Sequence, residues 1–321
     1  MLSETFEHLS ILTAHIAQKI IEDEGIDKFC ISPCDLAVIC HEKHYIQKDT
    51  IGKMLFHISE FEYMERRGGV FVLADKWRRM LPVKNNSQTF LREQGFYKIH
   101  LFQEKLAKKF IEIIKNETQK IDLGKLIYNL DAIDGSKGFN NLRSDAISSM
   151  EVSGTPQKIF DFNFGLGYSA TQLAALYQDS QIYSLQLNPS LKDAFEYTIL
   201  RFNKRNLEFS KNYPTEMINK LMKEKVDVIY MFNPLGIAIA EMEQFLGIAN
   251  QISKEGTKLL IVVPFKDEPK NTIISEWLGF CVEGMGYYLN PDSFRVMLPK
   301  YGFEIKHLDP KTNLIHAKYT V

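Results

Sequence analysis

Hydrophobic and polar positions follow two different rhythms along the 321-residue chain. In the first half, apolar residues recur every three or four positions, as from Phe6 through Leu9 and Leu12 to Ile16, which is the spacing of a helix with one buried face. After residue 156, short continuous apolar runs alternate with amphipathic segments. Because strands of a covered parallel sheet are apolar on both faces, this second rhythm predicts a mainly parallel sheet flanked by helices.

The N-terminal segment is predicted to form three helices followed by a hairpin. Ser32 to Asp35 has the composition of a helix cap, and Asp49-Thr50 is expected to cap the next helix. A turn at Arg66-Arg-Gly-Gly69 separates two short β-prone runs. The expected ranges are 4–24, 32–42 and 49–61 for the helices and 63–65 and 70–73 for the strands. Helices followed by a hairpin in this order predict a winged helix.

A central segment connects this part to the sheet. Periodic apolar residues predict helices at 102–118 and 123–130, and 135–138 is expected to be a loop. Ser153-Gly-Thr-Pro156 has the composition of a boundary. We therefore expect a winged-helix domain at 1–100, linker helices at 101–152 and an α/β domain at 153–321.

The α/β domain is predicted in detail from its alternation of patterns. Expected strands lie at 158–161, 182–187, 207–209, 226–232 and 258–263, followed by a closing hairpin at 304–308 and 313–320. Expected helices lie at 169–177, 191–203, 215–223 and 238–252, and a last one begins at Pro291. Ligands of open α/β sheets bind beyond the carboxyl ends of the strands, so the loops that follow these strands are expected to form the site.

Composition narrows the class of protein. With 45% hydrophobic and 25% charged residues the chain is globular, and a formal net charge of -1 gives no global attraction to nucleic acid. No apolar run approaches the roughly 18 residues that indicate a membrane span. Of four cysteines, Cys30, Cys34 and Cys40 are bunched and Cys281 is distant, which is no disulfide framework and indicates the cytoplasm. The bunched cysteines lack a C-x-x-C pair, so we expect no metal.

A glycine turn after the first predicted strand is the most informative motif. Gly165 and Gly167 follow the acidic residue Asp161, and glycines let backbone N–H groups come close to a ligand. The segment resembles motif I of the class I S-adenosylmethionine-dependent methyltransferases, acidic-x-Gly-x-Gly-x-Gly, with Asn163 in place of the first glycine. The resemblance implies a Rossmann-like sheet and S-adenosylmethionine as the cofactor.

The same resemblance implies the other cofactor-binding positions. Gln186 stands where the family usually has an acid that holds the ribose, and Asn212 stands where it often has Asp beside the adenine. Phe164 and Tyr168 are expected to flank the methionine and adenine parts. The pocket is therefore recognisable but poor in acidic side chains, and an amide is a weaker acceptor than a carboxylate.

The N-terminal pattern resembles the small-molecule O-methyltransferases. In that family the winged helix forms a dimer interface and helps to close the substrate pocket, which implies a homodimer and a small-molecule substrate. The histidine that usually deprotonates the substrate after the fourth strand is absent here. Glu241, Glu243 and Asp267 are the remaining candidate bases near strand ends.

The sequence thus predicts methyl transfer from S-adenosylmethionine to an oxygen or nitrogen of a small molecule. Three alternatives stay open. Asn233-Pro234 after the fourth strand is half of a motif found in base-modifying N-methyltransferases. The winged helix also permits a ligand-responsive DNA-binding regulator, although the third predicted helix offers only Lys53 and His57 as basic groups. Finally, the substitutions in the cofactor motifs permit a non-catalytic relative with a binding or assembly role.

Overall fold

The structure is a computed structural model that describes residues 2–77, 81–150, 154–210 and 214–320. The chain divides into two compact units. Unit 1 comprises Met1–Ile121 and Glu268–Gly286, and unit 2 comprises Asp122–Asp267 and Tyr287–Val321. Residues 101–152, expected to link two domains, are therefore divided between the units.

Unit 1 consists mainly of helices with a small antiparallel sheet. The expected order of three helices and a hairpin is present, and β2 and β3 are joined by a tight Gly68-Gly69 turn. A short third strand, β1, pairs with β3. The elements are α1 (Leu2–Asp23), β1 (Cys34–Asp35), α2 (Leu36–Glu42), α3 (Lys48–Ser59), β2 (Met64–Arg67), β3 (Val70–Leu73), α4 (Leu81–Gln94), α5 (Tyr97–Ile114), η5 (Pro269–Asn271) and α12 (Glu276–Gly279).

The predicted helix caps in unit 1 were partly wrong. Asp35 caps α2 by accepting a hydrogen bond from Ala37 N, whereas Cys34 belongs to strand β1. Helix α3 begins before Asp49, and its cap residue Gln47 makes no side-chain cap bond. Cys34 and Asp35, which the sequence pattern assigned to the start of the helix, pair with β3 instead.

His57 joins α3 to two other parts of unit 1. It is almost fully buried, its Nε2 lies 2.9 Å from Ser10 O in α1, and its Nδ1 lies 3.2 Å from Ser275 Oγ just before α12. These contacts fit a neutral ring that donates to the carbonyl and accepts from the hydroxyl. Burial lowers the pKa of His57 to about 4, against the opposing effect of the Ser10 hydrogen bond.

This pKa predicts that unit 1 loses stability in mild acid. An unfolded histidine binds a proton below pH 6.5, whereas the folded one stays neutral to about pH 4, so the stability held at neutral pH is lost as the pH falls through this window. Between pH 7 and pH 5 the loss should be about 2 kcal/mol. Both tryptophans, Trp77 and Trp277, lie in unit 1, so their fluorescence reports its unfolding in urea. A His57→Gln variant should lack most of this loss, and an equal loss in both proteins would contradict the assignment.

Unit 2 is built on a seven-stranded sheet, within the described residues, in the order β6-β5-β4-β7-β8-β10-β9. Strands β6, β5, β4, β7 and β8 run parallel, and β10 is antiparallel to both β8 and β9. The strands are β4 (Lys158–Asn163), β5 (Gln181–Leu185), β6 (Leu207–Ser210), β7 (Val226–Phe232), β8 (Ser253–Val262), β9 (Phe303–Asp309) and β10 (Leu314–Tyr319). The predicted strands and closing hairpin are confirmed, with small shifts at their ends.

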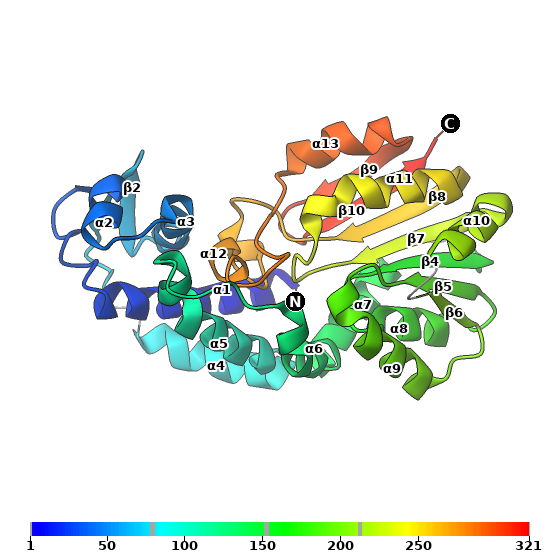
Figure 1. The fold of residues 1–321 in the computed structure, drawn as a ribbon, viewed down its shortest axis with the longest axis horizontal. Helices are drawn as coiled ribbons and strands as arrows, with labels where there is room; N and C mark the ends of the chain where they lie inside the picture. The colour runs from blue at the N-terminus through cyan, green and yellow to red at the C-terminus, as the bar shows by residue number, and fades with distance from the viewer. Residues whose placement is uncertain (1, 78–80, 151–153, 211–213, 321) are drawn as a thin grey trace. The chain divides into compact units, whose positions relative to one another are not determined.

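Helices cover both faces of this sheet. Figure 1 shows α7, α8 and α9 on one face and α10, α11 and α13 on the other. The predicted loop at 135–138 was wrong, because Ser136 accepts a hydrogen bond from Phe139 N and starts helix α7. The helices are η2 (Leu123–Leu126), α6 (Ile127–Asp134), α7 (Lys137–Ser148), α8 (Tyr168–Leu176), η3 (Pro189–Leu191), α9 (Lys192–Phe202), α10 (Pro214–Glu224), η4 (Ile239–Glu241), α11 (Met242–Ile252) and α13 (Pro291–Lys300).

Apolar and polar side chains alternate along β4 from residue 160 to residue 163. Phe160 and Phe162 are buried in the large apolar core, and Phe162 packs on Phe245 of α11. Asp161 and Asn163 have the other parity and both contact Ser169 of α8, on the opposite face. The central strand therefore presents an apolar side to one helical layer and a polar side to the glycine turn.

Candidate functional site

Two cavities lie at the carboxyl ends of β4, β5 and β7, where the sequence predicted the site. The smaller, of about 20 Å³, is lined by Asp134, Phe164, Gly165 and Asn233 among others. The larger, of about 120 Å³, is lined on one side by residues 162–164 and on another by residues 185–189. Phe164 and Ile237 line both cavities, and Phe164 is only 5% exposed.

The backbone amides of the glycine turn are occupied by the protein's own side chains. Asn163 Oδ1 accepts from Gly165 N at 3.0 Å and from Gly167 N at 3.2 Å. Asp134 Oδ2 accepts from Leu166 N at 3.2 Å. Gly167 has φ +94° and begins α8, as its place in the motif requires. The turn has the expected shape, but its N–H groups are not bare.

Asp161 is the centre of a buried polar cluster beneath this turn. Its carboxylate accepts hydrogen bonds from Ser184 Oγ on β5, Ser169 Oγ on α8 and Asn163 Nδ2. Burial raises the pKa of Asp161 to about 6, while these hydrogen bonds hold it lower than burial alone would. Asp161 lines neither cavity. It contacts the turn through Asn163 and through Ser169.

Gln186 closes the turn from the side of β5. Its Nε2 donates to Gly165 O at 2.7 Å, and its Oε1 accepts from Asn188 N at 2.9 Å. The side chain is 1% exposed and lines the larger cavity. The amide in the family's ribose-binding position is thus already bonded at both ends to the protein backbone.

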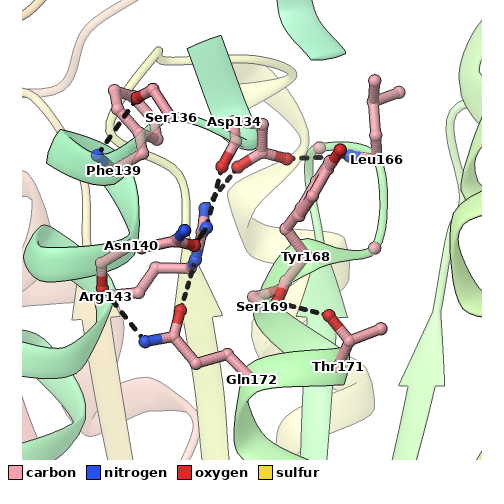
Figure 2. Close-up of polar contacts among 12 residues, drawn as sticks. Asp134, Ser136, Phe139, Asn140, Arg143, Leu166, Tyr168, Ser169, Thr171 and Gln172 are labelled. Carbon is pink, nitrogen blue, oxygen red and sulfur yellow. Dashed lines mark hydrogen bonds and ion pairs between the residues drawn. The ribbon is translucent and has the colours of Figure 1, made fainter. Parts of the chain in front are cut away.

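An ion pair between α6 and α7 holds the other side of the turn, as Figure 2 shows. Arg143 Nη1 donates to Asp134 Oδ1 at 2.5 Å, and Arg143 Nε donates to Gln172 Oε1 on α8 at 2.8 Å. Arg143 is fully buried and Asp134 is 13% exposed. Burial raises the pKa of Asp134, and the charge of Arg143 opposes that rise.

Other predicted site residues are placed as follows. Tyr168 donates to Asp131 Oδ1 at 2.8 Å, contacts Phe202 edge to face, and lines neither cavity. Asn233 is buried. Its Oδ1 accepts from Ile237 N and its Nδ2 donates to Ile237 O, so both ends of the side-chain amide are bonded within its own turn. Asn212 lies outside the described residues.

Asp134 and Arg143 are the two site residues that sequence reasoning missed. A signal for Arg143 existed, because it falls on the buried face of a helical pattern with Phe139, Leu142 and Ala146. A charged residue on such a face needs a buried partner. The space at Gly165 explains the partner's place, since a Cβ there would lie 2.6 Å from Asp134 Oδ2.

The features of the rival interpretations are occupied or absent in the described residues. On α3, Lys53 Nζ bonds Glu276 Oε1 at 2.8 Å and His57 is buried, so both basic groups are engaged by contacts within unit 1. In the described chain, no three His, Cys, Asp or Glu side chains gather as metal ligands. Among the helices that the structure describes, none has the length and apolarity needed to cross a membrane.

Comparison with known proteins gives matches in structure only. No protein-family model and no curated protein matches the sequence. The DszA carbon methyltransferase is 11% identical, with a TM-score of 0.65 over 98% of this chain and 90% of that one. The CMeT domain of the citrinin polyketide synthase is 14% identical, with a TM-score of 0.61 over 99% of this chain and 89% of that one. An O-methyltransferase family 2 protein from Planctomyces limnophilus, in complex with apigenin, is 12% identical, with a TM-score of 0.55 over 99% and 96%.

The chain has the class I methyltransferase fold. The matches extend over nearly the whole chain, so the helical N-terminal region is part of the likeness and not only the sheet. Within this fold, the cavities at β4 and β5 occupy the ligand end of the sheet. The predicted fold class and the resemblance to class I methyltransferases are confirmed, and the departure lies in the self-occupied glycine turn.

Proposed function

We propose that the chain binds S-adenosylmethionine beside the glycine turn and transfers its methyl group to a small-molecule acceptor. The observation that carries this proposal is the charge of the cavity walls. Among the described lining residues the charged groups are Glu241 and Asp134, of which Asp134 is paired with Arg143 outside the lining, and none is Lys or Arg. A cationic ligand fits such walls, whereas a phosphate-bearing dinucleotide does not.

The residues present fit the cofactor in charge but require one movement for its size. Pockets for ligands of this size measure roughly 300–1,000 Å³. Cavities of about 20 and 120 Å³ are smaller, and Phe164 lines both of them. Joining the two spaces would not be enough by itself, so binding requires Phe164 to rotate away and the neighbouring lining side chains to move apart.

The chemistry expected of the chain is positioning. S-adenosylmethionine supplies an electrophilic methyl group on a sulfonium. The apolar side chains Leu130, Phe139 and Leu235 line the smaller cavity and would exclude water from it. Asn233 is bonded within its own turn and no histidine comes directly after β7, so we expect no histidine base at the smaller cavity. The acceptor is then a group that is nucleophilic at neutral pH, and alignment supplies the rate.

Further parts of the proposal rest on resemblance. The apigenin-bound O-methyltransferase structure supports a small-molecule acceptor. The sequence led us to expect oxygen or nitrogen as the accepting atom, and the carbon methyltransferases among the neighbours add carbon as a candidate. The likeness of the N-terminal region supports a winged-helix homodimer. Four free cysteines support a cytoplasmic location.

Calorimetric titration tests the proposal. S-adenosylmethionine and S-adenosylhomocysteine should each bind with a Kd of about 1–100 μM, which corresponds to roughly 5–8 kcal/mol. Nicotinamide adenine dinucleotide should give no heat, because its phosphates meet carboxylate walls. Absence of binding for both sulfur ligands would remove the enzyme interpretation.

A non-catalytic role is the second candidate, and a specific observation favours it. Asn163, Asp134 and Gln186 already satisfy the amides and the carbonyl of the glycine turn, which methyltransferases of this fold offer to their cofactor. A protein that kept the fold for binding or assembly needs no open turn. The same titration separates the two candidates, since this one predicts no heat with either ligand.

A further inference from the structure

Arg143 makes several hydrogen bonds in addition to its ion pair with Asp134. Its Nη2 donates to Asp134 O at 2.7 Å and also to Asn140 Oδ1, in addition to the bonds of Nη1 to Asp134 Oδ1 and of Nε to Gln172. All three guanidinium nitrogens are therefore bonded within the protein while the side chain is fully buried. A lysine could keep the charge there but could not satisfy this fork.

Asp134 connects Arg143 to the glycine turn. One carboxylate oxygen faces Arg143 and the other accepts Leu166 N at 3.2 Å. The same oxygen fills the space that the missing Cβ of Gly165 leaves open. Asp134 also lines the smaller cavity, so its carboxylate touches the guanidinium, the turn and the ligand space at once.

Gln172 provides a second contact between Arg143 and the segment formed by the glycine turn and α8. It lies one helical turn into α8, accepts from Arg143 Nε, and donates from Nε2 to Ser144 Oγ at 2.6 Å. The turn and the helix that follows it are thus both tied to the α6–α7 corner. Figure 2 shows Arg143 between Asp134 and Gln172, with Leu166 beyond Asp134.

We propose that Arg143 is a positioning residue that sets the conformation of the glycine turn through Asp134, and so controls ligand affinity at the cavities beside Phe164. The effect on the turn stands on the contacts alone. The effect on affinity rests on the proposed function. Because Arg143 lines neither cavity, it acts without touching the ligand.

Hydrogen exchange of the turn tests the first part without any ligand. In Arg143→Lys, exchange of the amides at 165–167 should speed up about tenfold. Asp134 is then no longer held against Leu166 N, so the turn opens more often and also exposes the Gly165 and Gly167 amides that bond Asn163. Asp227→Asn is the matched control, since Asp227 Oδ2 also accepts backbone amides, from Gln157 and Lys158, at the other end of β4. It should leave exchange at 165–167 unchanged.

A milder variant keeps the test decisive if Arg143→Lys does not fold. Gln172→Ala removes one partner of Arg143 at a half-buried position and should speed exchange at 165–167 about threefold. Exchange at 165–167 that stays at the wild-type rate in every variant that folds overturns the proposal.

Ligand titration tests the second part. In Arg143→Lys the Kd of S-adenosylhomocysteine should rise about tenfold, while Asp227→Asn keeps the wild-type value. Faster exchange with an unchanged Kd would overturn the control of affinity. If the wild-type protein itself binds no S-adenosylhomocysteine, the proposed function fails, and the exchange results still decide the role of Arg143 in the turn.

Discussion

Replacing Asp134 by Ala is expected to lower the free energy of unfolding of unit 2 by about 3–5 kcal/mol, because it leaves the buried guanidinium of Arg143 without its counter-charge. Arg143 is fully buried and its Nη1 bonds the Asp134 carboxylate at 2.5 Å. The change also removes the acceptor of Leu166 N. An unpaired buried charge is among the few causes of such large single-residue effects.

Hydrogen exchange of β4 and β7 measures this loss within unit 2, because the slowest amides of the central strands exchange by unfolding of the unit. Glu304→Ala is the control, since Glu304 also lies in unit 2 and its exposed pair with Lys306 should contribute less than about 1 kcal/mol. A double variant with Asp134→Ala and Arg143→Met should recover part of the stability, as it removes the charge together with its partner. A loss below about 1 kcal/mol for Asp134→Ala would contradict the role of the pair.

The sheet could be predicted from the sequence because its strands are buried on both faces. Strand β7 covers 226–232 as predicted, since Asp227 is its only charged residue and no position along it is exposed. Helix α7 could not be predicted as easily. Gly135-Ser136-Lys137-Gly138 has the composition of a loop, yet Ser136 caps a helix there, and the same residue types serve both purposes.

The candidate site could be predicted only in part, because some of its contacts join residues that are far apart in the sequence. The glycine turn and the positive φ at Gly167 follow from local chemistry. What fills the turn does not, since Asp134 comes from another helix, 32 positions before Leu166. Asn163 indicated a missing glycine, but only the structure shows that its side chain takes the place of a ligand at two amides.

Truncating Phe164 should lower the free energy of unfolding of unit 2 and raise the affinity for the ligand. Phe164 is 5% exposed and packs edge to face on Phe245 of α11. Phe164→Ala should therefore cost about 3–4 kcal/mol of unfolding free energy in unit 2. It should also join the two cavities, so that a ligand no longer has to displace a packed ring.

The affinity for S-adenosylmethionine should then rise about tenfold, because a conformational change worth on the order of 1.4 kcal/mol is removed from the binding equilibrium. Hydrogen exchange of β4 and β7 gives the stability, and calorimetric titration gives the Kd. Phe303→Ala is the matched control, since Phe303 is fully buried, lies in β9 and lines neither cavity. It should show a similar loss of stability with an unchanged Kd. Weaker binding in Phe164→Ala would mean that the ring supports the ligand, and the need for it to move would be wrong.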